Sequence, residues 1–250
     1  MKQNNMIPKV IHYCWFGRNP LPPESVRCIE SWKKYCPDYE IKEWNEDNFD
    51  VDSCQYTSDA YKEKKYAFVS DYARFYVLYK YGGVYLDTDV EIIKPLDSIL
   101  EQGPFMGCEN TAVEGKRSYP LRVAPGLGMG SNAGNPFYNE MIQFYQNQSF
   151  YNSDGSLNLI TIVQYTTDKL RESGLVDEDR IQQVCGINIY PKEYFCPIDH
   201  VNDMKITDNT VSIHHYSGSW LPKKERLKGK VIKLLGSRIW NIVLKLRGVR

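Results

Sequence analysis

The sequence predicts an α/β fold in which a twisted, mainly parallel sheet is flanked by helices, and three observations support that prediction. Short runs rich in β-branched and aromatic residues alternate with longer runs whose apolar residues recur every three or four positions. The first two strand-like runs are separated by one helix-like run, an order that gives a right-handed crossover between parallel strands. The 250 residues, of which 42% are hydrophobic, are also enough to bury one sizeable core.

The first strand is expected over residues 7–16, a mostly apolar run of the kind that a buried central strand shows, and it ends at Gly17. Ligands of α/β sheets bind beyond the carboxyl ends of the strands, so this strand places Trp15 and Phe16 at the mouth of a cleft. A flat ring there can stack on a nucleobase, and packing in the core is the alternative role for both rings.

A helix over residues 22–35 and a strand over residues 39–44 follow. Proline is favoured in the first turn of a helix, and Pro22 and Pro23 supply it here, while Pro37 ends the helix. The segment 39–44 alternates apolar and polar residues, which is typical of a strand with one buried face. A strand, a helix and a second strand in this order predict a parallel pair.

The central stretch of the chain is residues 70–89, which read SDYARFYVLYKYGGVYLDTD. Apolar residues recur at helical spacing up to a glycine pair that can end a helix, and a short strand is expected over residues 84–90. Side chains two apart on a strand point the same way, so Asp87 and Asp89 are predicted to lie side by side. Such a pair is tolerated when it is solvated, when one carboxyl is protonated or when a cation lies between them, and the last arrangement makes a ligand site.

Asp71 and Arg74 lie three residues apart on the predicted helix, so their side chains are neighbours on one face. Together they offer a hydrogen-bond acceptor and a forked donor near the end of the strand that carries the two aspartates. This pairing suits the hydroxyl groups of a sugar. An exposed ion pair of little energetic value is the alternative.

The string from Ser70 to Asp89 resembles the sugar-binding region of the glycosyltransferases that contain an Asp-x-Asp (DXD) motif, and it is most similar to family 32. That family includes fungal mannosyltransferases and bacterial capsular polysaccharide sugar transferases, and the glucosyltransferase domains of the large clostridial toxins share the pattern. An Asp-x-Asp alone is common by chance, whereas this whole string is specific. The opening IPKVIHYCWFG is also similar to the start of these enzymes.

The resemblance implies a GT-A-like fold and a hexosyltransferase that moves a sugar from a nucleoside diphosphate sugar, a UDP-sugar being favoured, to a growing glycan with retention of anomeric configuration. It implies Mn²⁺ or Mg²⁺ as the cofactor, which neutralises charge on the leaving diphosphate. It also implies roles for the residues that match the family pattern. Asp71 and Arg74 hold the sugar, Asp87, Asp89 and His215 bind the metal, and Trp15, Phe16, Ser70, Tyr85, Asp87 and Trp220 contact the nucleotide.

Residues 211–220, VSIHHYSGSW, show a strand-like alternation that stops in a glycine-serine turn. Adjacent histidines on a strand face opposite sides, so one of His214 and His215 is expected to pack and the other to reach the cleft. In related enzymes a metal ligand is followed three residues later by a small residue and two residues after that by a tryptophan. That register selects His215, Gly218 and Trp220, whose indole N–H would stabilise the leaving phosphate; two histidines that only support the structure are the alternative.

The glycine-rich stretch 125–136, PGLGMGSNAGNP, allows the backbone to run close to a ligand or to a neighbouring strand. It is not a phosphate-binding loop, because it has neither a Walker glycine-lysine pair nor a Gly-x-Gly-x-x-Gly after the first strand. In the resembling families this region forms a strand and turn beside the aspartates, on the acceptor side. Ser131 and Asn132 are therefore candidates for contact with the acceptor, and ordinary turn chemistry is their alternative role.

Two segments are expected: a glycosyltransferase domain over residues 1–221 and a basic amphipathic segment over residues 222–250. The chain has 31 basic and 31 acidic residues, but the second segment holds ten basic residues and one glutamate, so its charge is +9 and that of the preceding residues is −9. Its aliphatic residues and Trp240 form an apolar face as in a helix that lies in a membrane interface. This composition favours binding to an anionic membrane over binding to nucleic acid. A helix packed on the domain is the alternative.

The N-terminal residues include no apolar run long enough for a signal peptide or a membrane span, so a cytoplasmic protein bound peripherally to the inner face of the membrane is expected. Such a protein would meet a lipid-linked glycan acceptor at that surface. Two other function classes stay open. A catalytically inactive sugar-nucleotide or glycan-binding module is disfavoured by the intact Asp71, Arg74, Asp87 and Asp89, and a metal-dependent phosphohydrolase would need more carboxylate and histidine ligands.

Overall fold

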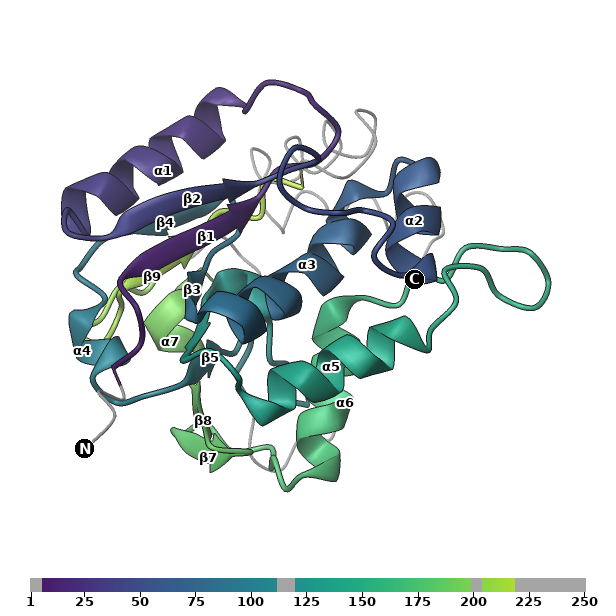
Figure 1. Ribbon diagram of the computed structural model, residues 1–250. Coiled ribbons are helices and arrows are strands. Elements are labelled where there is room, and N and C mark those ends of the chain that lie inside the picture. The colour runs from purple at the N-terminus through teal and green to yellow at the C-terminus, as the bar shows by residue number, and fades with distance from the viewer. Residues whose placement is uncertain (1–5, 112–119, 199–203, 219–250) are drawn as a thin grey trace, which may run out of the picture.

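A seven-stranded mixed sheet with helices on both faces is the centre of the fold (Figure 1), in a computed structural model that describes residues 6–111, 120–198 and 204–218. The predicted α/β architecture is confirmed. Trp220 and the predicted basic segment 222–250 lie outside the described residues. Within the described ranges, none of the helices is long and apolar enough to cross a membrane.

Strands and helices alternate along the described chain. The strands of the large sheet are β1 (Val10–Cys14), β2 (Glu40–Trp44), β3 (Gly83–Tyr85), β5 (Phe105–Gly107), β6 (Met129–Ser131), β7 (Gln182–Val184) and β8 (Ile187–Tyr190). A second, two-stranded sheet pairs β4 (Val90–Ile92) with β9 (Ser212–His214). The helices are α1 (Pro23–Tyr35), α2 (Gln55–Lys62), α3 (Tyr66–Tyr81), α4 (Asp97–Leu100), α5 (Pro136–Gln146), α6 (Ile162–Glu172) and α7 (Lys192–Phe195), with a 3₁₀ turn η1 (Pro125–Leu127).

The strand order of the large sheet is β2-β1-β3-β6-β5-β8-β7. β1 pairs in parallel with both β2 and β3, and β5 pairs in parallel with β8, while β6 and β7 run antiparallel to their neighbours. Because β6 is antiparallel to both β3 and β5, five of the seven strands share one direction, as a mainly parallel sheet requires. The carboxyl ends of β1 and β3 therefore meet at one edge of the sheet, where α/β proteins bind ligands.

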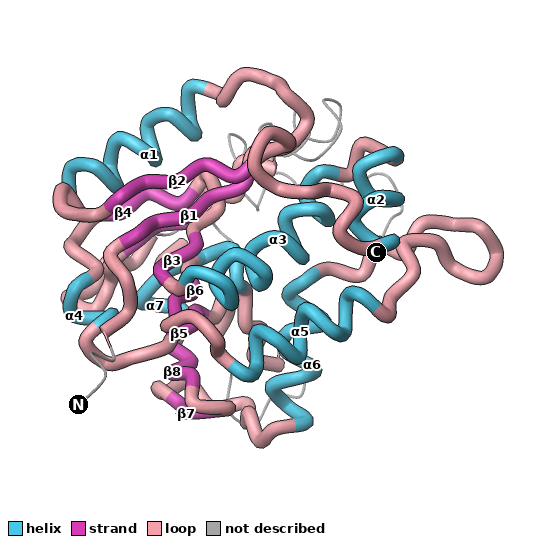
Figure 2. The backbone as a smooth tube through the Cα atoms, viewed as in Figure 1, coloured by secondary structure: helices cyan, strands magenta, loops and turns pink. Residues whose placement is uncertain are grey.

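Helices cover both faces of the large sheet and enclose two hydrophobic cores (Figure 2). On one face α2, α3, α5 and α6 contribute to a buried cluster that includes Phe75. On the other face α1, α4 and α7 contribute to a second cluster, which includes Trp32. Successive side chains of a strand point to opposite faces, so β3 supplies Val84 to the second core and Tyr85 to the first.

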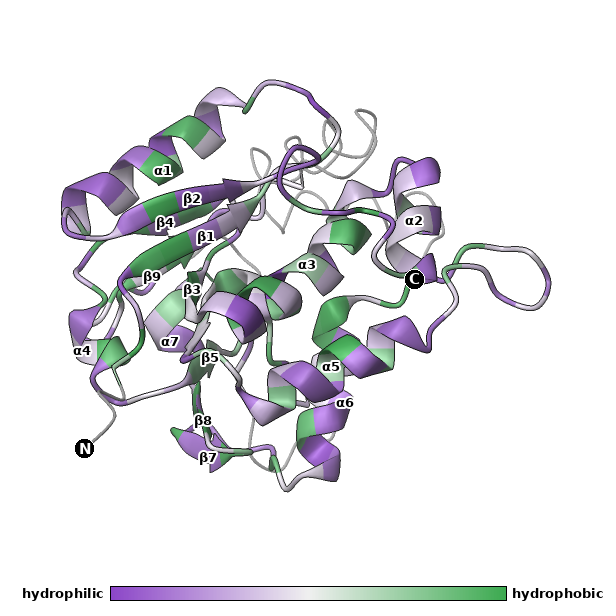
Figure 3. Cartoon of the chain, in the orientation of Figure 1, coloured by the Kyte–Doolittle hydropathy of each residue, from purple (hydrophilic) through white to green (hydrophobic). Residues whose placement is uncertain are grey.

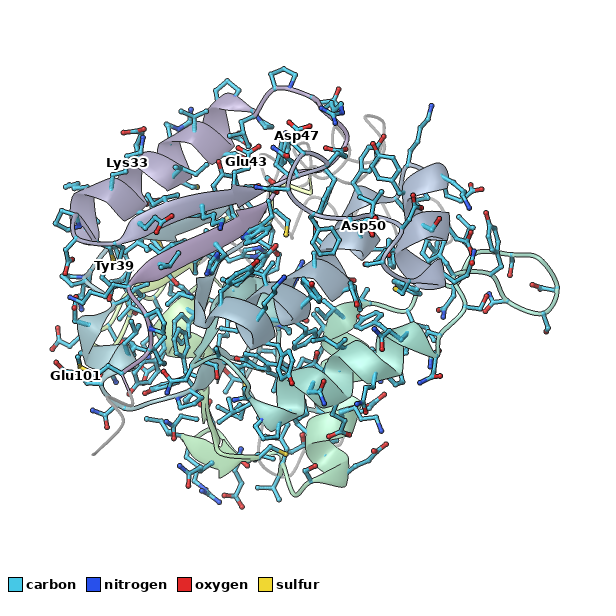
Figure 4. All side chains as sticks on the ribbon, in the orientation of Figure 1. Lys33, Tyr39, Glu43, Asp47, Asp50 and Glu101 are labelled. Atoms are coloured by element: carbon cyan, nitrogen blue, oxygen red, sulfur yellow. The ribbon has the colours of Figure 1, made fainter. Side chains whose placement is uncertain are left out.

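The outer helices are amphipathic, as this layered arrangement requires. On α1 and α5 the hydrophobic residues appear as stripes on otherwise polar helices (Figure 3). Side chains fill the space between the helices and the sheet, whereas Lys33 on α1 and Glu101 after α4 lie on the outside (Figure 4). α3 differs, because ten of its sixteen residues are buried, and among them are the polar Asp71 and Arg74.

Two glycines join α3 to β3 where the chain passes close to β1. Gly82 and Gly83 have φ angles of +68° and +99°, which L-residues rarely adopt. A Cβ on Gly83 would lie 2.7 Å from the carbonyl oxygen of Val10 and 2.9 Å from Nε2 of His12. The predicted helix end at this glycine pair is confirmed, and the absence of a side chain lets β3 approach β1.

Gly83→Ala is expected to lower the free energy of unfolding by about 2–4 kcal/mol, because it adds both an unfavourable φ and a backbone clash. Gly174→Ala is the matched control: Gly174 has a φ of +104°, yet a Cβ there meets no atom within 4 Å. The control therefore isolates the backbone strain and should cost about 1 kcal/mol. Urea unfolding of both variants measures the difference, and equal losses would contradict the close packing of β3 on β1.

Candidate functional site

The two aspartates lie in a turn and not on a strand, so the strand expected over residues 84–90 is wrong in its length. β3 ends at Tyr85 and β4 begins at Val90, and between them the N–H of Val90 donates to the carbonyl oxygen of Asp87 at 3.0 Å. This turn, rather than strand alternation, brings Asp87 and Asp89 together. It follows the carboxyl end of β3, at the ligand-binding edge of the sheet.

Asp89 is held by residues at and after the end of β9. One of its carboxylate oxygens accepts hydrogen bonds from the backbone N–H of Ser217 at 2.8 Å and from its hydroxyl at 3.0 Å, and the other lies 3.1 Å from Nε2 of His214. Burial by itself would raise the pKa of Asp89, but His214 and the bonds from Ser217 lower that pKa well below its usual range. Asp89 is therefore an anion at physiological pH.

The structure brings the side chain of His214, and not that of His215, to the carboxylates of the two aspartates. Asp87, Asp89 and His214 each offer one ligand atom, and these atoms lie within 4.8 Å of one another. Nε2 of His215 lies instead 2.8 Å from Oε2 of Glu91. The reason is the register of the small sheet, which pairs His214 with Val90, the residue that directly follows the turn. Of the two histidines, the one whose side chain lies with the aspartates is therefore His214, whereas the sequence pattern selected His215.

Asp87 is fixed by neighbours from three elements. Its backbone N–H donates to the carbonyl oxygen of Gly126 in η1 at 3.0 Å, and its Oδ1 accepts from the hydroxyl of Tyr85 at 3.0 Å and lies 3.3 Å from Nη2 of Arg74. Burial raises the pKa of Tyr85 well above its ordinary value, so the hydroxyl keeps the proton that it donates. Tyr85 is buried, and the structure shows it orienting Asp87 rather than lining an open pocket.

Arg74 is a buried cation that two carboxylates share. Its Nη2 lies 3.2 Å from Oδ1 of Asp71 and 3.3 Å from Oδ1 of Asp87, its Nε donates to the carbonyl oxygen of Ser70, and its guanidinium lies over the ring of Tyr85. Burial by itself would lower the pKa of Arg74, but Asp87, Tyr85 and Asp71 raise it above its ordinary value. Arg74 stays charged. The predicted pairing of Asp71 with Arg74 is confirmed, and it is buried rather than exposed.

Asp71 has a carboxyl group that titrates near neutral pH. Burial raises the pKa of Asp71 to about 7, although Arg74 and the backbone amide of Ile162 act in the opposite direction, and the charge of Asp87 adds to the rise. In its protonated form Asp71 donates a hydrogen bond as well as accepting one. A sugar hydroxyl does both, so this carboxyl group matches it in either protonation state.

Trp15 and Phe16 follow β1 at the same edge of the sheet but differ in exposure. The indole N–H of Trp15 donates to the carbonyl oxygen of Asn19 at 2.6 Å, and the residue is half-buried. Phe16 is buried against Phe49, with ring centroids 5.6 Å apart. Trp15 therefore keeps the exposure that stacking on a base needs, whereas Phe16 packs in the core.

The acceptor candidates Ser131 and Asn132 lie at the far end of β3 from the aspartates. Ser131 pairs with Gly83 in the register of β6 on β3 and is buried. Its hydroxyl donates to the carbonyl oxygen of Asn132 at 2.9 Å and accepts from the side-chain amide of Asn135 at 2.9 Å, which is turn chemistry. The structure does not bring either residue to the site, and Trp220 lies outside the described residues.

The side chains of Asp87, Asp89 and His214 fit a divalent cation. Two carboxylates and one imidazole, each offering one ligand atom, form a set of the kind that suits Mn²⁺ or Mg²⁺. Nδ1 of His214 is buried and has no hydrogen-bond partner among the described residues. A buried nitrogen without a partner is costly unless something else satisfies it. Within the described ranges, this is the one cluster of three or more such side chains.

A paired-aspartate turn at the ligand edge of an α/β sheet, beside a buried Asp71–Arg74 pair, is the arrangement expected of a DXD sugar-binding region. Residues 22–106 match the family described as the glycosyltransferase sugar-binding region containing DXD motif. That range runs from the start of α1 to β5 and includes both aspartates. The resemblance drawn from residues 70–89 is confirmed.

Several known proteins are similar to this chain. Inositol phosphoceramide mannosyltransferase 3 of Schizosaccharomyces pombe is 29% identical over 149 residues, which cover 56% of this chain but 38% of that protein. An uncharacterised glycosyltransferase of Acanthamoeba polyphaga mimivirus is 26% identical over 230 residues, 87% of this chain and 85% of the viral protein. The solved structure of a glycosyltransferase involved in glycosylation of the major capsid of PBCV-1 aligns over 89% of this chain and 98% of its own, with 12% identity and a TM-score of 0.49.

Sequence reasoning missed two residues that hold the aspartates, Ser217 and Gly126. Ser217 lies in the glycine-serine turn that the pattern identified, but the pattern assigned its small-residue role to Gly218. Gly126 lies in the glycine-rich stretch, whose composition indicates a close approach without naming the partner. In both cases the sequence pattern identified the segment, but it did not show which distant residue the segment contacts.

Asp71→Asn is expected to stabilise the protein at neutral and higher pH. The folded pKa of Asp71 is about 7 and lies above that of an aspartate in an unfolded chain, so the wild type loses stability as the pH rises from about 4 to 7. The asparagine variant lacks this loss and leaves Arg74 paired with Asp87 alone. Its advantage should grow over that range and level off at roughly 2–4 kcal/mol above it.

Urea unfolding at a series of pH values measures this difference. Asp208→Asn, at an exposed position away from the site, is the control for the substitution itself. A stability difference between wild type and Asp71→Asn that stays constant from acid to neutral pH would contradict the buried, protonated state of Asp71.

Proposed function

We propose that the protein transfers a sugar from a nucleoside diphosphate sugar, a UDP-sugar in the first instance, to a glycan acceptor, with Mn²⁺ or Mg²⁺ as cofactor and with retention of anomeric configuration. The observation that carries this proposal is the cluster of Asp87, Asp89 and His214, whose ligand atoms lie within 4.8 Å of one another. The family match to a DXD sugar-binding region supports it, and the mannosyltransferases among the relatives support a hexose as the transferred group.

The charges of the site explain the need for a cofactor. The diphosphate of the donor is strongly anionic, and Asp87 and Asp89 alone would repel it. A divalent cation held by these two aspartates and His214 would attract the diphosphate and neutralise the charge that develops on it as the sugar leaves. Asp87 is oriented by Tyr85 and Arg74, and Asp89 by Ser217, so both carboxylates are in place before any ligand binds.

The sugar is proposed to bind at the Asp71–Arg74 pair. Asp71 offers a carboxyl group that can accept or donate a hydrogen bond, and Arg74 connects it to Asp87 on the diphosphate side. The acceptor hydroxyl would attack the anomeric carbon on the face from which the diphosphate departs. The new C–O bond forms as the old one breaks, and the hydroxyl proton passes to the leaving phosphate oxygen. For Trp220, a role in stabilising that phosphate is implied by the family resemblance alone.

The acceptor is proposed to be linked to a lipid, because two apolar side chains are exposed next to the sugar-binding residues. Leu159 and Ile160 are 52% and 47% exposed, and the backbone amide of Ile162, two residues further on, faces Asp71. Asn158 accepts a hydrogen bond from the N–H of Ile160, which holds the pair in place. The relative named for an inositol phosphoceramide supports a lipid, and the composition of residues 222–250 supports peripheral attachment to the inner face of an anionic membrane.

Asp87→Ala and Asp89→Ala are each expected to lower turnover of the donor by at least about a hundredfold while the protein stays folded, because each removes a preorganised charge from the site. His214→Ala should lose turnover as well, whereas His215→Ala is the matched control from the same strand end and should keep most of it. The measurement is slow hydrolysis of a panel of UDP- and GDP-sugars with Mn²⁺, and circular dichroism checks the fold.

Near wild-type turnover by either aspartate variant, or by the wild type in excess chelator, would contradict the proposed site. A wild type that binds donors and hydrolyses none of the panel would indicate the alternative function, an inactive sugar-nucleotide or glycan-binding module. A loss in His215→Ala with retention in His214→Ala would restore the ligand predicted from the sequence pattern.

Replacing Leu159 and Ile160 together by serine is expected to raise KM for a lipid-linked acceptor by about tenfold and to leave donor hydrolysis unchanged, because the apolar area buried with the lipid is lost. Serine at Val176 and Ile181 is the matched control, since these residues are similarly exposed, at 42% and 45%, but lie beside the edge strand β7. An equal rise in KM in both double variants, or no rise in either, would contradict the proposed lipid contact.

A further inference from the structure

Asp87 packs against the backbone of η1 more closely than a side chain would allow. A Cβ built on Gly126 would lie 2.0 Å from Oδ2 of Asp87, 2.8 Å from its Cγ and 3.2 Å from Nη1 of Arg74. The first two distances are far inside the contact distance of non-bonded atoms, which is about 3.5 Å or more between carbons. The carboxylate of Asp87 therefore occupies the space that any side chain at position 126 would need.

The backbone of η1 is tied on both sides of this contact and cannot retreat from it. The N–H of Asp87 donates to the carbonyl oxygen of Gly126 at 3.0 Å, and the N–H of Leu127 donates to the carbonyl oxygen of Ala124 at 3.1 Å. Ala124 is in turn bonded to Gly107 of β5 at 2.9 Å. Leu127 and Ala124 are also buried in the core. A side chain at position 126 would displace Asp87 or Arg74 before it displaced the backbone.

The conformation of Gly126 does not by itself require glycine. Gly126 is not among the residues with a positive φ, whereas Gly128, two residues further on, has a φ of +153°. Alanine can adopt the backbone angles at position 126. The requirement for glycine there comes from the contact with Asp87 and Arg74.

We propose that Gly126 is a positioning residue for the transfer, an inference that rests on the proposed function of Asp87. Oδ1 of Asp87 receives the bonds from Tyr85 and Arg74, while Oδ2 lies against Gly126. The absence of a side chain at position 126 thus allows the carboxylate of Asp87 to adopt its observed rotation and its observed distance from the guanidinium of Arg74. One atom added at position 126 would disturb both the cation-binding group and the sugar-binding pair, because it crowds Asp87 and Arg74 together.

The test is the affinity of the full chain for Mn²⁺, measured by titration calorimetry, together with donor hydrolysis. Gly126→Ala should weaken Mn²⁺ binding by about ten- to hundredfold, as is usual when the support of a ligand is lost. Turnover should fall by about a hundredfold, because a displacement of about 1 Å has that effect on a reacting site. Wild-type affinity for Mn²⁺ in Gly126→Ala would overturn the proposal.

Gly130→Ala is the matched control, four residues away in β6 and also without a positive φ. Its Cβ would meet the ring of Phe105 at 2.4 Å in the core, so it should lower the melting temperature but change Mn²⁺ affinity by less than about twofold. Weakening of Mn²⁺ binding in both variants to the same extent would assign Gly126 a general structural role and overturn the proposal.

A stability cycle tests the contact itself without relying on activity. Gly126→Ala should lower the melting temperature in the wild type and have a much smaller effect in an Asp87→Ala background, where the two Asp87 atoms are absent and only Nη1 of Arg74, at 3.2 Å, remains near the added Cβ. An equal change in melting temperature in both backgrounds, or a double variant that fails to fold, would contradict the proposed contact between position 126 and Asp87. If the wild type binds no Mn²⁺, the proposed function fails, and this cycle still decides whether Gly126 positions Asp87.

Discussion

The buried guanidinium of Arg74 is the interaction on which the candidate site depends. It lies between Asp71 on its own helix and Asp87 in the turn after β3, and both carboxylates are partly or wholly removed from water. Without Arg74, the buried carboxyl group of Asp71 would face the partly buried carboxylate of Asp87, and an uncompensated buried charge typically costs several kcal/mol. The cation therefore permits a buried helix to carry Asp71, and it joins the pair proposed to hold the sugar to the residues proposed to hold the cofactor.

The remaining supports of the site come from parts of the chain that are far apart in sequence. Gly82 and Gly83 bring β3 against β1, and the turn that follows β3 is then clamped from one side by η1 and from the other by the end of β9. Asp89 depends on Ser217, which is 128 residues further along the chain. The site is thus fixed by backbone approach and by hydrogen bonds to the aspartates, and its carboxylates need little reorganisation when a ligand binds.

Local sequence patterns predicted α1, β2, the end of α3 at the glycine pair and the pairing of Asp71 with Arg74, because each depends on residues within one or two helical turns. The strand expected over residues 84–90 was too long, because the turn at Asp87 is stabilised by Gly126, a contact that no local pattern contains. The choice between His214 and His215 depends on the register of β9 against β4. Ser131 was misplaced for a similar reason: only the antiparallel pairing of β6 with β3 shows that it lies at the end away from the aspartates.

The central claim is that Asp87, Asp89 and His214 form a cation site through which a nucleoside diphosphate binds. The most direct measurement is the affinity of the protein for UDP and GDP by titration calorimetry, once with Mn²⁺ present and once with a chelator. Binding free energies of two ligands at one site are reciprocal, so Mn²⁺ should raise the affinity for the preferred nucleotide by about tenfold or more. Nucleotide binding of the same strength with and without the cation would contradict the account.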